Sequence, residues 1–213
     1  MKYPRESNAP AFAALALLVV ISALALAACG DDGATAQAPT DLPTRTAPVA
    51  AYTFPPLASP LPEPTDLHAL GETDALEFVP WVDIEVSALG YYDNGGDGLK
   101  DTHRVAIFDT SSRKVVSLVQ ITSEDTLQDG YRYEALKTGA VLKGGTSYVM
   151  AGEVGRDAAP ARPVGMEWAP EIDFVVYRMN TKGWGYPEQK VPGRTYAVMN
   201  FLFMPVSAAS PTP

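Results

Sequence analysis

The stretch Val82-Asp83-Ile84-Glu85-Val86-Ser87-Ala88 decides the fold class. Apolar and polar side chains alternate along it with a period of two, so one face packs on a core and the other faces water. This pattern is typical of a half-buried antiparallel strand. Further short runs rich in Val, Ile, Tyr and Phe, bounded by turn residues, predict more strands. They cover residues 105–108, 114–122, 131–136, 147–154, 172–177 and 196–203.

An all-β domain follows from these strands. Outside the N-terminal segment, no stretch carries a capped apolar stripe of period 3.6, so a parallel sheet would lack its crossover helices. Seven or eight short, unevenly spaced strands fit an antiparallel β-sandwich better than a closed eight-stranded barrel. We expect a jelly-roll-like sandwich over residues 66–206.

Composition narrows the functional classes. The 213-residue chain has one cysteine, two histidines and a formal charge of −9. A single cysteine excludes an internal disulfide framework and a cysteine-based zinc site. With 25 acidic against 16 basic residues and no basic stripe, the sequence indicates that nucleic acid is not a partner.

The N-terminus has the anatomy of an export signal. Lys2 and Arg5 precede an uninterrupted run of small and apolar residues from 11 to 28. The run ends in Leu26-Ala27-Ala28-Cys29-Gly30, which resembles the lipobox of bacterial lipoproteins. That resemblance implies cleavage of residues 1–28 and a lipid-modified Cys29 that anchors the protein outside the cytoplasm, on the cell surface or in the periplasm. The alternative is an uncleaved membrane helix, which the short run fits less well.

Proline-, alanine- and threonine-rich segments flank the expected domain. Residues 29–65 lack periodic apolar residues, so we expect a disordered tether that reaches about 100 Å where it is polyproline-like. Phe54 and Leu57 are the side chains that could dock on the domain and shorten it. Residues 207–213 predict a short disordered tail.

Several short motifs agree in order with a known bacterial domain. They are Phe78-Val79-Pro80, the run from Val86 to Asp93, Gly96-Asp97-Gly98-Leu99 with His103, Val105 to Asp109, Gly130 to Tyr133, Gly145 to Val149 and Asn200 to Phe203. Together they are similar to an uncharacterised domain of bacterial secreted and surface proteins, many of which bear a PEP-CTERM sorting tail. The resemblance implies a β-sandwich without an assigned activity. This chain differs in having a lipobox in place of that tail.

An Asp- and Gly-rich loop over residues 93–101 is a candidate calcium site. Relative to an EF-hand loop, Asp93, Asp97 and Asp101 occupy positions one, five and nine, and Gly98 occupies the sharp-turn position. Position twelve, however, is Arg104 instead of a bidentate glutamate. The alternative is a connection between strands in which Asn-Gly supplies positive φ and the aspartates cap backbone amides.

Loop aromatics are candidate ligand-binding residues. Trp184 and Tyr186 lie in a stretch too rich in Gly and Pro for a central strand, and Trp168 could join them from the preceding loop. Such rings can stack on sugars or anchor a partner. The alternative is that they close the ends of the sandwich.

No motif identifies an enzyme. The sequence has no nucleophile elbow, zinc-protease helix or phosphate-binding glycine loop, and His103 fits best as a hydrogen-bonded structural residue. We therefore expect a lipid-anchored, non-catalytic binding or surface-interaction module, with carbohydrate or an envelope component as ligand. A structural envelope protein is the main alternative. A carbohydrate-active hydrolase with a carboxylate pair from Glu85, Asp93 or Asp97 is a weaker one.

Overall fold

The computed structural model describes residues 38–55, 70–157 and 165–206. They belong to one compact unit, Gln37–Pro213. The export signal, Cys29 and the tail at 207–213 lie outside the described residues. Within the described residues every regular element is a β-strand, and none forms a helix suited to crossing a membrane.

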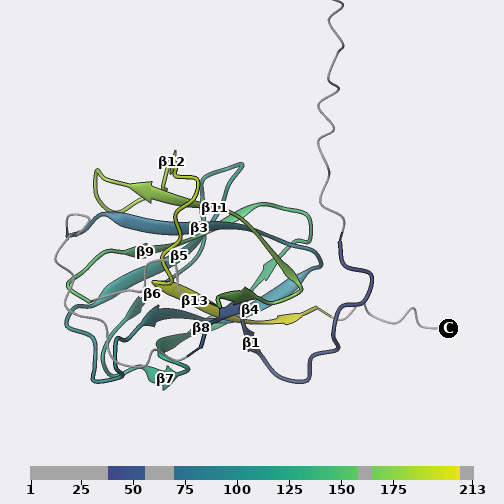
Figure 1. The fold of residues 1–213 in the computed structure, drawn as a ribbon, viewed down its shortest axis with the longest axis horizontal. Coiled ribbons are helices and arrows are strands. Elements are labelled where there is room, and N and C mark those ends of the chain that lie inside the picture. Colours follow the sequence, from purple (N-terminus) through teal and green to yellow (C-terminus); the bar gives the residue numbers. More distant parts are fainter. Residues whose placement is uncertain (1–37, 56–69, 158–164, 207–213) are drawn as a thin grey trace, which may run out of the picture. The chain divides into compact units, whose positions relative to one another are not determined.

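Two large antiparallel sheets pack together in the described part of the chain, which confirms the predicted β-sandwich (Figure 1). The six-stranded sheet has the order β12 (Gln189–Lys190), β11 (Ile172–Asn180), β3 (Thr73–Pro80), β9 (Tyr148–Glu153), β5 (His103–Asp109) and β6 (Val115–Ile121). The five-stranded sheet has the order β1 (Val49–Ala50), β13 (Met199–Pro205), β4 (Ile84–Tyr92), β8 (Tyr131–Leu142) and β7 (Thr126–Gln128). A separate pair joins β2 (Tyr52–Thr53) to β10 (Glu167–Trp168).

The core lies between the sheets and holds them together. Leu76 and Phe78 of β3 are fully buried, and the Phe78 ring lies 5.1 Å from the ring of Phe201 in β13. Many sheet neighbours are distant in sequence, such as β3 beside β9 and β13 beside β4. The chain passes from one sheet to the other before it returns to pair with an earlier strand, as in jelly-roll architectures.

The central strand β3 is an element that the alternation of side chains did not predict. Seven of its eight residues are buried, on both faces of the sheet, so its sequence lacks the period of two. It also carries two buried acids whose partners come from β11. Tyr177 donates a hydrogen bond to Asp74, and the Arg178 Nε donates to Glu77 Oε2 at 2.7 Å.

The N-terminal boundary of the domain differs from the expected one. Residues 49–53, which the sequence placed in the tether, join the sandwich: Val49 pairs with Phe203 and Glu167 with Thr53. Tyr52 is 1% exposed. Phe54 packs against Tyr92 and Tyr131, as a docked side chain would. Leu57 lies outside the described residues. The folded domain therefore begins before residue 66.

Polar side chains fasten this N-terminal segment. The Asn200 side chain accepts a hydrogen bond from the Ala51 N–H at 3.1 Å and donates one to the Tyr52 carbonyl at 2.9 Å. Arg45 donates from Nε and Nη2 to the two carboxylate oxygens of Glu171, whose side chain is fully buried. We call residues 45–55 the N-terminal strap.

Candidate functional site

An aromatic and cationic cluster lies on the side of the six-stranded sheet that carries Phe108 and Arg104 of β5. The rings of Trp184 and Tyr186 lie 6.3 and 5.7 Å from the ring of Phe108. The guanidinium carbon of Arg104 lies 4.9 Å from the centre of the Trp184 ring, and that of Arg113 lies 5.7 Å from the centre of the Tyr186 ring. We call these five residues the Trp184 face.

The loop that carries Trp184 and Tyr186 is held in place by side chains of β3 and β11 that hydrogen-bond to its backbone. Thr73 Oγ1 of β3 donates to the Gly183 carbonyl at 3.0 Å and accepts from the Gly185 N–H at 3.2 Å. Gly183 has φ +114°, a conformation that favours glycine. Arg178 Nη1 donates to the Pro187 carbonyl at 3.1 Å. The rings are thus positioned by the sheet beneath them.

Each arginine at this cluster has an acidic partner. Arg104 makes two hydrogen bonds to Glu153, at 2.7 and 2.6 Å, and these hydrogen bonds lower the pKa of Glu153 despite its partial burial. Arg113 pairs with Glu188 at 2.7 Å, and both side chains are more than half exposed. Burial raises the pKa of the Tyr186 hydroxyl. The rings of the Trp184 face are therefore flanked by ion pairs.

Trp168 does not share this cluster. Its ring stacks on Phe174 at 5.3 Å and contacts Tyr52 at 4.9 Å, beside the N-terminal strap. The three candidate aromatics therefore divide into two groups. Trp184 and Tyr186 both lie against the ring of Phe108. Trp168 instead packs against Tyr52 of β2.

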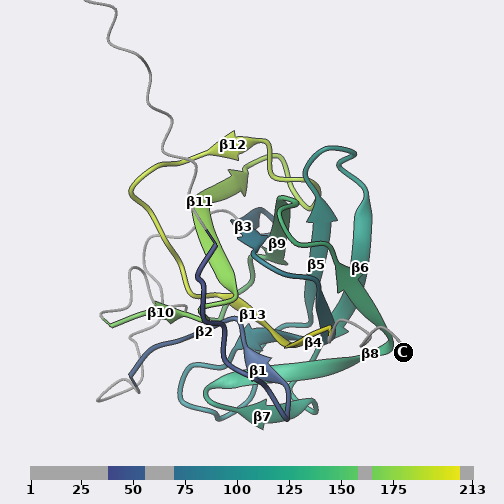
Figure 2. The ribbon, with the colours of Figure 1, turned by 90° about the vertical axis from the view of Figure 1, so that its right-hand side faces the viewer.

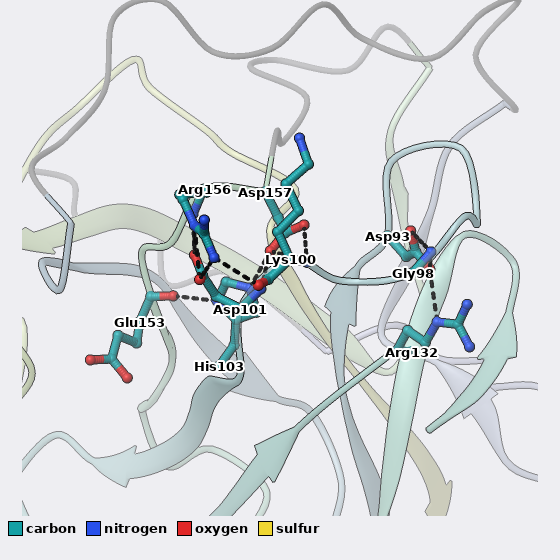
Figure 3. Close-up of polar contacts among 9 residues, drawn as sticks. All are labelled: Asp93, Gly98, Lys100, Asp101, His103, Arg132, Glu153, Arg156 and Asp157. Atoms are coloured by element: carbon teal, nitrogen blue, oxygen red, sulfur yellow. Dashed lines mark hydrogen bonds and ion pairs between the residues drawn. The ribbon is translucent and has the colours of Figure 1, made fainter. Parts of the chain in front are cut away.

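The Asp- and Gly-rich loop is organised by hydrogen bonds within the protein (Figure 3). Asp93 is 1% exposed, accepts from the Gly98 N–H, and pairs with Arg132 Nε at 2.7 Å. Asp101 accepts from the Arg156 N–H at 2.7 Å and pairs with its guanidinium at 2.6 Å. Hydrogen bonding to Arg156 lowers the pKa of Asp101.

These contacts bear directly on the calcium hypothesis. Asp93 and Asp101 face different arginines, and Asp97 is exposed. Over the three described ranges, no group of three or more acidic, histidine or cysteine side chains could hold a metal ion. The geometry corresponds to the alternative of a connection between strands whose aspartates cap backbone amides. We therefore do not propose a calcium site.

His103 anchors the far end of the same loop (Figure 3). Its Nε2 lies 2.7 Å from Asp157 Oδ2 and its Nδ1 lies 3.0 Å from the Glu153 carbonyl oxygen. The ring is 1% exposed and stacks on Tyr91 at 3.6 Å. Asp157 also accepts from the Lys100 N–H at 2.9 Å. Because both ring nitrogens contact protein oxygens, the structure places His103 in a structural role.

Asp157 is a residue that the sequence did not single out. Burial opposes its charge, but hydrogen bonds from His103 and from the Lys100 amide lower its pKa. Close packing completes the cluster, since a Cβ on Gly155 would lie 2.4 Å from His103 Cε1. The sequence does not reveal the contact between His103 and Asp157. The two residues meet only because the chain returns to His103 after β9.

Comparison with known proteins does not assign the chain to a family. No family model matches the chain, and no match is found among curated proteins.

Proposed function

We propose that this chain is a lipid-anchored, extracytoplasmic binding module of a bacterial envelope, without catalytic activity. Its anchor is Cys29, and its ligand is a carbohydrate of the envelope. The observation that carries the binding part is the Trp184 face, where Trp184 and Tyr186 converge on Phe108 beside Arg104 and Arg113.

The chemistry of this cluster suits a sugar ring. The partly buried rings of Trp184 and Tyr186 offer a rigid apolar surface at low entropic cost. Arginine and glutamate side chains beside them provide directional donors and acceptors for hydroxyl groups. Arg113 is 62% exposed along its side chain, so a ligand can displace it from Tyr186 at little cost in stability.

Binding of isolated cell-wall polysaccharide tests the proposal. The detergent-solubilised full chain is mixed with insoluble polysaccharide, and the bound fraction is measured over a range of protein concentrations. Trp184→Phe keeps an apolar ring but reduces the stacking surface, and Trp184→Ala removes it. We expect the affinity to fall about tenfold or more with Trp184→Ala, since stacked aromatic anchors dominate such contacts.

Trp168→Phe is the matched control because Trp168 lies in the other aromatic group. It should leave the affinity unchanged. Thermal unfolding of each variant separates lost binding from lost structure. Binding that survives in a folded Trp184→Ala variant, or turnover of the polysaccharide by the wild type, would contradict the proposal.

A further inference from the structure

Strand β6 forms one edge of the six-stranded sheet, next to β5 (Figure 2). Its sequence, residues 115–121, contains no charged side chain. Three apolar side chains on it are exposed: Val115 at 51%, Val116 at 39% and Leu118 at 49%. Edge strands are normally protected by charge, by short length or by a covering segment, because their free backbone groups can pair with another chain.

The other terminal strands of the two large sheets are protected by their length. β12 and β1 have two residues each and β7 has three, whereas β6 has seven. In an antiparallel strand, N–H and C=O groups alternate between the two sides, so about half of those in β6 point away from β5. β8 passes near β6 where the sheets meet, but among the described strands the only ladder to β6 comes from β5.

The charges beside β6 identify the partner that fits it. Lys114 precedes the strand and Glu124 follows it. The neighbouring charges of Arg113 and Asp125 already have partners within the chain, in Glu188 and Thr122. If two copies of β6 pair antiparallel about Leu118, its middle residue, the cationic end of each copy meets the anionic end of the other. Val115 then lies opposite Ile121, and Val116 opposite Gln120, without any pair of like charges in the ladder. A parallel pairing would place like ends together.

We propose that β6 pairs with β6 of a second copy of this chain, joining two six-stranded sheets into one continuous sheet. The interface is isologous, as expected for a two-fold dimer. Lys114 and Glu124 are both exposed, so their side chains are available for this contact. The inference rests on β6 and its flanks, and it does not depend on the proposed function.

The substitution Leu118→Lys, at the axis of the proposed dimer, tests the proposal. Sedimentation equilibrium of the full chain in density-matched detergent gives the protein mass of wild type, Leu118→Lys and Val175→Lys. Val175 is the control because it is 44% exposed on β11, inside the same sheet. We expect twice the protomer mass for wild type and Val175→Lys, and the protomer mass for Leu118→Lys.

Exchange of the flanking charges tests the identity of the partner. Lys114→Glu or Glu124→Lys alone should weaken the dimer about tenfold, because each creates two like-charge contacts across the axis. The double variant should restore the wild-type dissociation constant. Wild-type protein at the protomer mass, with or without a different polypeptide bound to β6, would overturn the proposal. So would a double variant that fails to recover.

Discussion

Most acidic side chains in the interior of this domain face a specific cation or backbone amide, and Asp74 faces the Tyr177 hydroxyl. Glu171 receives Arg45, Glu77 receives Arg178, and Asp93 receives Arg132. Removal of one partner of such a pair is costly because the other charge stays buried without compensation. The net charge of −9 therefore says little about the interior, where charges are balanced locally.

The pairing of Asp157 with His103 predicts a pH-dependent effect of Asp157→Asn. The pKa of Asp157 is lowered in the folded protein, so its ionised form stabilises the fold above the unfolded-state value of about 3.9. This stabilisation is lost as the pH falls through the folded-state pKa. We expect Asp157→Asn to lower the free energy of unfolding by about 3 kcal/mol at pH 7.

Urea unfolding of wild type and Asp157→Asn between pH 2 and 7 measures this effect. The difference between the two proteins should shrink as the pH falls below about 4, where Asp157 of the unfolded chain binds a proton. Asp97→Asn is the control, because Asp97 is exposed and its substitution should change stability by less than about 0.5 kcal/mol. A difference that stays constant down to pH 2 would count against a stabilising role of the ionised Asp157 carboxylate.

At the scale of elements, the N-terminal strap is the feature with the clearest energetic consequence. β1 and β2 have two residues each, too short to remain in place by ladder hydrogen bonds alone. Asn200 supplements them by bonding Ala51 and Tyr52, and the hydroxyl of Tyr52 donates to the Met199 carbonyl. The side chain of Asn200 thus substitutes for part of a longer strand pairing.

Asn200→Ala should loosen the strap. The Tyr52 carbonyl loses the Asn200 donor in a buried site, so we expect the free energy of unfolding to fall by about 2 kcal/mol. Limited proteolysis should cut residues 45–55 faster than in wild type. Asn180→Ala is the matched control, since the Asn180 side chain accepts a hydrogen bond from Lys182 in an exposed turn. Equal cleavage rates in the two variants would refute this role.

Strands with alternating polar residues, such as β4, and strands with an uncharged apolar run, such as β5 and β9, could be predicted from the sequence. The long strand that could not be predicted is β3, which is buried on both faces and yet contains acidic residues. The alternation at Val82–Ala88 indicated β4 because its polar positions, such as Glu85, face solvent. β3 shows no such alternation because the Trp184 loop covers its second face, and its charged residues find partners about a hundred positions away. The strap was missed for a different reason: its prolines and alanines resemble a linker in composition.

The candidate site was predictable only in part because its members come from distant segments. Trp184 and Tyr186 stand out in a Gly- and Pro-rich loop, and the structure brings them together. The arginines that contact them come from β5 and from the turn after it, which local sequence does not connect to the loop. Trp168, which the sequence placed in the preceding loop as a further candidate, instead packs on the strap.

For the molecule as a whole, docking of the strap shortens the spacer to the proposed anchor. Because Arg45 of the strap is bonded to Glu171, the spacer after Cys29 comprises residues 30–44. An extended polyproline-like spacer of this length reaches about 45 Å, instead of about 100 Å. If Cys29 carries the proposed lipid, the domain stays close enough to the membrane to meet envelope components near its surface.

The proposed lipid anchor predicts the behaviour of Cys29→Ser. We expect this variant to lose incorporation of a labelled fatty acid completely, because the thiol is the group that carries the diacylglycerol in lipoproteins with such a motif. Gly30→Ala, which keeps the cysteine, should retain the label. A Cys29→Ser protein that is still labelled would disprove the assignment.

The most direct test of the binding claim uses the indole N–H signals of the three tryptophans. Spectra of the ¹⁵N-labelled full chain in detergent, assigned by Trp→Phe substitution, are recorded during titration with soluble fragments of envelope polysaccharide. We predict a saturable shift of the Trp184 signal, with the Trp81 and Trp168 signals unchanged. Saturable binding that shifts the Trp168 signal and leaves that of Trp184 in place would contradict the account.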